Sequence, residues 1–384
     1  MVYDFDEVID RRSSDSEKWN QYESDVLPLW VADMDFRVAE PIVHALSDRL
    51  SHGVFGYGKD GPGLREAVSE RMERLYSWKV HPDEVVLFPG VISGFNLACQ
   101  AFTKAGEGVL VQTPVYPPFL SAPLNAGALR QEMELCRQPD GRYTIDFKRF
   151  ESAMDSTTRL FLLCNPHNPV GRVFTREELQ AMAEICLKRN VFICADEIHG
   201  ELVFEGHRHV PIASLSPEIG QMTITLGSPS KAFNIPGLYC SYAIIQNPEL
   251  RRRFQAARRG LVGHGNILGM VAGEVAYREG DEWLTQVLRY LQVNRNLLYD
   301  VIRETMPDLK MALPEGTYLA WIDCRSAGIH EKPGEFFLKE ARVALVDGEV
   351  FGKGGDGFVR LNFGCRRAVL LEALERMRAA LERK

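Results

Sequence analysis

Two residues in the middle of the chain, Asp196 and Lys231, have the types and the surroundings that chemistry requires. Asp196 follows the apolar run "VFICA" (191–195), and a carboxylate at the end of a buried strand is costly unless it meets a cation. Its ordinary alternative role is to cap a following helix. Lys231 lies in "GSPSKAFNIPG" (227–237), a composition that marks loops, so its ordinary interpretation is a solvated lysine on a surface turn.

A bound cofactor accounts better for this pair of residues. Enzymes that use pyridoxal 5'-phosphate (PLP) need a lysine for the cofactor's aldehyde, an acid beside its ring nitrogen and a pocket for its phosphate. A protonated ring nitrogen would satisfy the buried carboxylate of Asp196, and Lys231 would supply the amine. The two residues therefore predict PLP as the cofactor.

Short apolar runs that alternate with helical patterns must position these residues. The runs are rich in β-branched and aromatic residues and lack polar alternation, which predicts strands buried on both faces. Residues 175–190 predict a helix with Thr175 as N-cap and Glu178 as its capping-box partner. Strand and helix at this spacing indicate a mostly parallel α/β sheet. The predicted strands are 85–88, 109–112, 159–164, 191–195, 223–226 and 242–245.

The rest of the chain suggests a division into two domains, because 384 residues exceed what one small core organises. Long helical patterns occupy about 248–305, and mixed α/β patterns return in "TYLAWIDC" (317–324) and "FVRLNFG" (358–364). We expect a large cofactor-binding domain at 46–284. A small α/β domain is expected to combine 1–45 with 285–384.

Five predicted strands end in polar or Gly/Pro-rich segments. In an open parallel sheet, ligands bind beyond the carboxyl ends of the strands. The five segments should therefore meet at one edge of the sheet and form one site. They are 89–93, 113–116, "NPHNPVG" (165–171), "DEIHG" (196–200) and the segment that contains Lys231.

Composition and charge exclude several other classes of function. A net charge of -7 does not favour binding to nucleic acids or anionic membranes, and the arginines of 250–260 fit the solvated face of a helix. The eight cysteines show no C-x-x-C pair and no metal-ligand spacing, so we expect reduced thiols, no metal and a cytoplasmic protein. The acidic N-terminal segment has no apolar stretch, so we expect no signal peptide, and four prolines argue against a membrane span at 108–129.

Several motifs carry a resemblance to a known family. "NPHNPVG", "DEIH", "SPSKAFNIPG" and "FVRLNFG", taken together, resemble the fold-type I PLP superfamily that contains the class I/II aminotransferases. "LWVADMDF" (29–36) and "HGVFGYG" (52–58) are similar to its cystathionine β-lyase branch, the carbon–sulfur lyases related to maltose-regulon modulators. The resemblance runs from about residue 25 to the C-terminus. It implies the fold-type I transferase fold, a mostly parallel sheet between helices with a smaller α/β domain.

The resemblance implies a role for each residue around the cofactor ring. Lys231 would hold the cofactor's aldehyde and then move the substrate's Cα proton, while Asp196 would keep the ring nitrogen protonated. Asn168 would hydrogen-bond the ring's 3-oxygen, Tyr116 would stack on the ring, and His199 would contact it. Without the resemblance, an asparagine between prolines is a turn residue, and a lone histidine or aromatic residue after a strand is structural.

The phosphate has its own expected set of contacts. Val91 and Ile92 would offer backbone N–H groups at a helix N-terminus, and Ser228 and Ser230 would add hydroxyls. "GSPSK" is not a Walker A loop, because a serine replaces the glycine before the lysine. Tyr57 resembles the tyrosine that reaches the phosphate from a neighbouring subunit, which implies a homodimer.

Arg360 is the expected anchor of the substrate. It lies in an otherwise apolar strand, where an unpaired cation is costly, and the resemblance gives it the substrate's α-carboxylate through a bidentate fork. Ala32, in the "LWVADMDF" segment, and Tyr57 are also expected at the substrate.

These parts labilise bonds at Cα and do not themselves choose the reaction. Similarity to the branch favours β-elimination from L-cystathionine or a related cysteine thioether, which gives a thiol, pyruvate and ammonia. A class I/II aminotransferase is the alternative, and a regulatory binding protein on the same fold is a third possibility. The presence of Lys231, Asp196 and Arg360 counts against that third possibility, and so does our expectation of no appended DNA-binding domain. The physiological thioether stays open at this stage.

Overall fold

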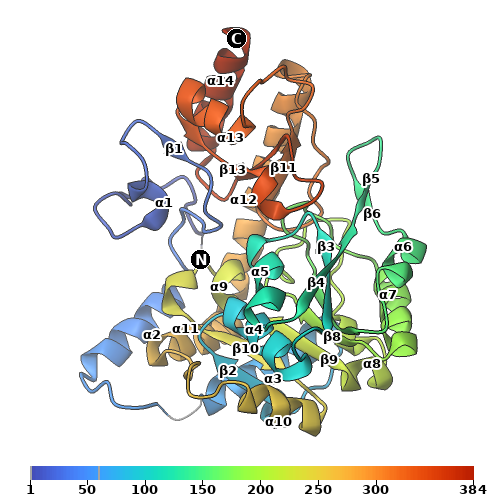
Figure 1. Ribbon diagram of the computed structural model, residues 1–384. Helices are drawn as coiled ribbons and strands as arrows, with labels where there is room; N and C mark the ends of the chain where they lie inside the picture. The colour runs from blue at the N-terminus through green and yellow to red at the C-terminus, as the bar shows by residue number, and fades with distance from the viewer. Residues whose placement is uncertain (1, 59–60) are drawn as a thin grey trace.

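The centre of the protein is a seven-stranded sheet, which fills the lower half of the molecule in Figure 1. The computed structural model describes residues 2–58 and 61–384. The strand β10 runs antiparallel to both of its neighbours, β2 and β9, and the other pairs are parallel, which confirms the predicted mostly parallel sheet. In spatial order the strands are β2 (Val85–Phe88), β10 (Ser241–Ile244), β9 (Thr223–Gly227), β8 (Phe192–Asp196), β7 (Thr158–Cys164), β3 (Gly108–Thr113) and β4 (Leu129–Glu134).

The central strands are buried on both faces, as their continuous apolar runs predict. Successive residues enter different cores: Val109 and Val111 pack with helix α4 (Val91–Phe102), while Leu110 packs with helix α7 (Arg176–Arg189). Helices α5 (Pro117–Asn125) and α10 (Pro248–Ala256) share the first face with α4. Helices α6 (Phe147–Ser152) and α8 (Pro217–Gln221) share the second face with α7.

Helix α7 begins as its sequence predicts. The hydroxyl of Thr175 accepts a hydrogen bond from the backbone N–H of Glu178 at 3.2 Å, and the Glu178 carboxylate accepts one from the Thr175 N–H at 2.8 Å. This reciprocal pair is the predicted capping box.

Two features of the sheet differ from a direct interpretation of the sequence. Strand β4 has the polar sequence "LRQEME" and lies at the sheet edge, so it lacks the apolar run that marks the buried strands. Strand β10 is antiparallel, yet its sequence has the same apolar composition as the parallel strands, because burial and not strand direction determines composition. The stretch 248–305 is helical as expected and divides into α10, α11 (Ile267–Glu279) and α12 (Asp281–Thr305).

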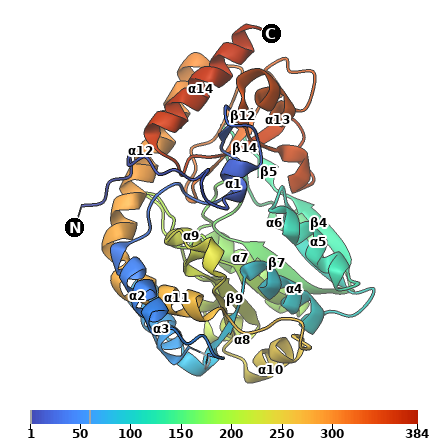
Figure 2. The same ribbon diagram turned by 90° about the vertical axis from the view of Figure 1, so that its left-hand side faces the viewer.

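The C-terminal part builds a smaller antiparallel sheet from β11 (Leu319–Asp323), β14 (Phe358–Asn362) and β13 (Val346–Asp347). Strand β1 (Leu27–Pro28) pairs with β12 (Val343–Ala344), so the N-terminal segment joins this part. Figure 2 shows α12 rising beside α14 (Arg367–Glu382). The division at 45 and 284 stays a prediction. The remaining elements include α1 (Glu17–Asn20), α2 (Glu40–Ser51), α3 (Pro62–Tyr76), α13 (Pro333–Phe336), β5 (Cys136–Arg137), β6 (Tyr143–Thr144) and α9 (Pro229–Ala232).

All eight cysteines are unpaired. Across residues 2–58 and 61–384, no helix combines the length and the apolar character that crossing a membrane demands.

Candidate active site

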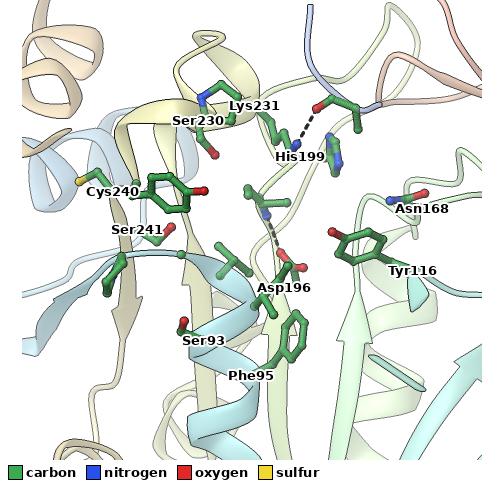
Figure 3. A pocket seen from close by; sticks show the side chains of 18 of the residues that line it. Ser93, Phe95, Tyr116, Asn168, Asp196, His199, Ser230, Lys231, Cys240 and Ser241 are labelled. Atoms are coloured by element: carbon green, nitrogen blue, oxygen red, sulfur yellow. Dashed lines mark hydrogen bonds between the residues drawn. The ribbon is translucent and has the colours of Figure 1, made fainter. Parts of the chain in front are cut away.

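A cavity of about 340 Å³ opens where the parallel strands of the large sheet end (Figure 3). Each of the five segments predicted to meet at this edge contributes to its wall. The cavity therefore lies at the position that the sequence predicts for a ligand. The predicted residues in its lining are Ala32, Val91, Ile92, Tyr116, Asn168, Asp196, His199, Ser230 and Lys231.

Lys231 points its amine into this cavity. It lies on the one-turn helix α9, and its Nζ donates a hydrogen bond to the carbonyl oxygen of Ala32 at 2.5 Å. Burial lowers the pKa of Lys231 to about 8, although Asp33 opposes that shift. The unprotonated form of the amine, which attack on an aldehyde requires, is therefore more populated near neutral pH than in an exposed lysine. The alternative of a solvated surface lysine is wrong.

Asp196 ends strand β8 and faces the same cavity. Its Oδ1 accepts a hydrogen bond from the Ile198 N–H at 3.1 Å, and a turn, not a helix, follows it. The alternative role as a helix N-cap is therefore wrong. Burial raises the pKa of Asp196 to about 7, against the opposing effects of Ile198 and Lys231. A cation placed beside this carboxyl would lower its pKa again and would bind strongly.

Three further predicted residues surround the space between these groups. Tyr116 precedes α5 and Asn168 follows β7, and Figure 3 shows both on the side of the cavity away from Ser230. The Asn168 carbonyl accepts a hydrogen bond from the Tyr116 N–H at 3.0 Å, which ties the two segments together. His199 is buried with its ring edge-on to Tyr318, and burial lowers its pKa to about 3, so the imidazole is neutral.

The opposite end of the cavity suits an anion. Helix α4 begins there, and no side chain among the described residues caps its N-terminal N–H groups, which include those of Val91 and Ile92. Twelve residues of helix place a partial positive charge at this end. Ser230 lines the cavity, and so do Ser93 and Ser241, whose hydroxyls the sequence analysis did not single out. Ser241 begins the antiparallel strand β10, which is why a search of strand carboxyl ends passes over it.

Ser228 lies apart from the other predicted residues. Its buried hydroxyl donates a hydrogen bond to the Cys240 carbonyl at 2.6 Å and accepts one from the Ser230 N–H at 3.0 Å. It thereby caps α9 and does not line the cavity. Its contact with a phosphate stays a prediction.

Arg360 lies in β14, deep beside the cavity. Its Nη1 donates a hydrogen bond to Asn168 Oδ1 at 3.2 Å and its Nη2 donates one to the Trp30 carbonyl at 2.9 Å. The guanidinium also faces the ring of Phe351. Burial lowers the pKa of Arg360 to about 10, and its buried Nε finds no hydrogen-bond acceptor among the described residues. Part of the fork is therefore free for an anionic group.

Ala32 and Tyr57 have opposite surroundings. The Ala32 carbonyl accepts hydrogen bonds from Lys231 and from the Tyr318 hydroxyl, the latter at 2.8 Å. Tyr57 is fully exposed, together with Val54 and Phe55, and does not line the cavity of its own chain. Its predicted contacts with phosphate and substrate are not formed within one chain.

Comparisons with known proteins agree over nearly the whole chain. The chain is 40% identical to cystathionine beta-lyase PatB of Bacillus subtilis, over 98% of this chain and 99% of that protein. A crystal structure of OvoB is 45% identical and superposes with a TM-score of 0.94, with 99% of both chains covered. Cystalysin from Treponema denticola, a crystal structure that contains PLP, is 36% identical with a TM-score of 0.96 and full coverage of both chains.

A model of the family of class I and II aminotransferases matches residues 24–377. The matched range includes all strands of the two larger sheets and the complete lining of the cavity. The resemblance in the motifs around Asp196 and Lys231 is thus part of a match that extends through the fold. This chain belongs to the family of class I and II aminotransferases.

Proposed function

We propose that the protein is a PLP-dependent carbon–sulfur β-lyase that acts on L-cystathionine or a related cysteine thioether. The observation that carries the PLP-dependent chemistry is that a buried carboxyl, Asp196, and an amine of lowered pKa, Lys231, face one cavity. Support comes from relatives named cystathionine beta-lyase and from the 32% identical PLP-bound C-S lyase of Staphylococcus hominis.

The cavity suits PLP at each of the cofactor's polar groups. Burial raises the pKa of Asp196 in spite of the charge of Lys231, and the carboxyl forms no ion pair with any described residue, so a protonated ring nitrogen would supply the missing partner. Lys231 would bind the aldehyde, and the uncapped N-terminus of α4 with Ser230 would hold the phosphate. Asn168 would bind the 3-oxygen, Tyr116 would stack on the ring and His199 would contact it. When bound, PLP withdraws electrons from the Cα of a bound amino acid and thereby weakens the Cα–H bond.

The chain's own residues would direct that weakening toward elimination. Arg360 would bind the substrate's α-carboxylate with its free N–H groups and so orient Cα, while Lys231 Nζ would take the Cα proton. The Cα–H electron pair then forms a Cα=Cβ bond, and sulfur leaves with the electrons of the Cβ–S bond. The thiolate gains a proton, and one water molecule converts the remaining enamine to pyruvate and ammonia.

The same residues would also serve transamination, and the family name makes an aminotransferase the second candidate. The two reactions differ in stoichiometry, because elimination needs no 2-oxo acid as an amino acceptor. We expect the purified, PLP-loaded protein to release pyruvate from L-cystathionine alone, measured by coupling to lactate dehydrogenase. The Lys231→Ala protein serves as the control and should release none. Turnover that depends on an added 2-oxo acid would contradict the lyase assignment.

The active unit is proposed to be a homodimer in which Tyr57 reaches the phosphate and substrate of the partner's cavity. Val54, Phe55 and Tyr57 are 62%, 56% and fully exposed, and a contiguous exposed apolar stretch is typical of an interface. Ile92 and Tyr239, at the cavity, are also 46% and 64% exposed. A second subunit that covers these residues would complete the site.

Two coarser features belong to the proposal. The large PLP-binding domain would comprise 46–284, and the small domain would comprise 1–45 with 285–384, which is supported by the pairing of β1 with β12. A cytoplasmic location is supported by eight unpaired cysteines, since reducing compartments preserve free thiols.

A further inference from the structure

The segment from Trp30 to Met34 is held in place by side chains. It forms neither helix nor strand, yet each of its five consecutive carbonyls accepts a side-chain hydrogen bond. Most of the donors come from distant parts of the chain, so the segment joins strand β14 of the small sheet to helix α9, which follows strand β9 of the large sheet. In order along the segment the donors are Arg360, Asn362, Lys231 with Tyr318, Asn362 with Lys18, and Asn234 with Arg11.

Two of these donors are the proposed anchor of the substrate, Arg360, and the proposed base, Lys231. Arg360 binds the carbonyl of Trp30 at 2.9 Å, and Lys231 binds the carbonyl of Ala32 at 2.5 Å. The two acceptors are separated by one residue, so the position of the segment sets the position of one group relative to the other. A shift of the segment would move the substrate's anchor and the amine together.

A group of four charged residues fixes the segment from its other side, and we call Arg11, Lys18, Asp33 and Asp35 the charge quartet. Arg11 bridges Asp33 Oδ2 at 2.8 Å and Asp35 Oδ1 at 2.7 Å. Lys18, whose side chain is 0% exposed, lies 2.8 Å from Asp35 Oδ2 and 3.5 Å from Asp33 Oδ1. With two positive and two negative charges the quartet is neutral, as burial of such groups requires.

The two carboxylates of the quartet are not equivalent. Asp35 accepts hydrogen bonds from Arg11, Lys18 and the Trp19 indole, so both of its oxygens are satisfied. Asp33 accepts one from Arg11 Nη2, whereas its buried Oδ1 accepts none from the described residues. Asp33 directly follows the carbonyl that binds Lys231, and its charge acts on that amine. Part of the charge of Asp33 is thus available to the active site.

We propose that Asp33 is a positioning residue of the active site, which holds the carbonyls of Trp30 and Ala32 for Arg360 and Lys231 and whose negative charge acts on the Lys231 amine across the segment. This inference rests on the proposed roles of Lys231 and Arg360. It does not depend on which thioether is cleaved or on whether elimination or transamination follows.

The charges around Lys231 determine what loss of Asp33 would do. Asp33 on the segment and Asp196 on β8 favour the protonated amine, while Arg360 on β14 and burial disfavour it. His199 beside it is neutral. In Asp33→Asn the quartet carries one net positive charge, and the effect of Arg360 on the Lys231 amine is less opposed by negative charge. The pKa of Lys231 therefore falls below about 8. We expect a fall of about 1 unit, the size that a nearby opposite charge produces.

The test measures the amine of Lys231 directly, on full-length protein freed of cofactor. Brief labelling with acetic anhydride across a pH series, followed by mass spectrometry of the Lys231 peptide, gives the midpoint at which the amine becomes reactive. Asp33→Asn should lower this midpoint by about 1 unit. Asp35→Asn is the matched control, because it removes the same charge from the quartet, and it should leave the midpoint almost unchanged. Asp33→Glu should restore the wild-type midpoint.

A variant that should shift the Lys231 midpoint in the opposite direction keeps the test decisive if Asp33→Asn does not fold. Arg11→Gln removes a cation from the quartet, leaves Asp33 less compensated and should raise the Lys231 midpoint. The positioning role adds a second measurement on PLP-loaded protein. Asp33→Asn should raise KM for the amino acid substrate about fivefold or more, because the Trp30 carbonyl that orients Arg360 is held less firmly.

Equal shifts in Asp33→Asn and Asp35→Asn would overturn the inference, and so would an unchanged midpoint in both Asp33→Asn and Arg11→Gln. Failure of the protein to bind PLP would contradict the proposed function instead, while the labelling measurement would still decide the role of Asp33.

Discussion

Replacement of Arg360 by lysine tests the proposed anchor of the substrate most directly. An arginine has five N–H donors in a planar fork, and two of those of Arg360 bind Asn168 and Trp30. Three donors remain, and one of them, at Nε, is buried without an acceptor among the described residues. A substrate carboxylate can accept two of these in parallel. Lysine keeps the positive charge and loses the fork.

The expected loss follows from the strength of such bonds. A hydrogen bond to a charged group contributes about 1.5–3 kcal/mol, so loss of one of a bidentate pair costs about 2 kcal/mol. This cost corresponds to an increase of about 30-fold in the KM or Kd for the substrate. The kcat should change much less, because Arg360 does not take part in the bond changes at Cα and Cβ.

The assay compares a thioether amino acid with its carboxamide, which has the same shape and no anionic charge. Wild-type protein should prefer the acid over the amide in kcat/KM by about 30-fold or more, and Arg360→Lys should lose most of that preference. Arg342→Lys is the matched control, since Arg342 pairs with Asp25 and Glu23 on the exposed surface and does not line the cavity. An equal loss of activity toward acid and amide in Arg360→Lys would refute the reasoning, because it would indicate general damage to the site.

Three further outcomes test other parts of the molecule. Asp196→Asn should raise the Tm of cofactor-free protein at pH 8 and not at pH 4. The pKa of Asp196 in the folded protein is raised to about 7, so the wild-type protein loses stability as pH rises from about 4 through 7. An equal gain in Tm at both pH values would count against a buried charge at Asp196. Mixed dimers of Tyr57→Ala and Lys231→Ala should recover about a quarter of wild-type pyruvate release, because about half of the dimers are mixed and each mixed dimer has one complete site out of two. No recovery would place Tyr57 in the site of its own chain. Thr175→Ala should lower the free energy of unfolding by about 1 kcal/mol in urea, and an unchanged midpoint would deny the cap of α7 a role in stability.

Much of the active site was predictable because the fold obeys a simple geometric rule. Continuous apolar runs in the sequence predict buried parallel strands, and the carboxyl ends of such strands meet at one edge of the sheet. Tyr116, Asn168 and Asp196 each follow such a run, so their convergence on one cavity required no knowledge of the side-chain packing.

The residues that escaped prediction depend on information that composition does not carry. Ser241 lines the cavity because β10 is antiparallel, and an apolar run has the same composition in either direction. Ser228 sits within one motif with Ser230, yet hydrogen bonding to Cys240 turns its hydroxyl away from the cavity. Tyr57, which its motif predicts at the site, is fully exposed within one chain, and its place in a partner's cavity stays a prediction.

The direction of β10 has a consequence for how the chain can vary. Because β10 runs against β9, the chain that leaves β9 through Lys231 returns to the same edge of the sheet and enters β10 at Ser241 without crossing the sheet. The length of the segment 228–240 between the two strand ends thus fixes the position of Lys231. An insertion here would displace the amine from Ala32, whereas the far end of β10, which leads to α10, can change in length without reaching the cavity. Length variation among related chains should therefore collect at the far edge and spare this segment.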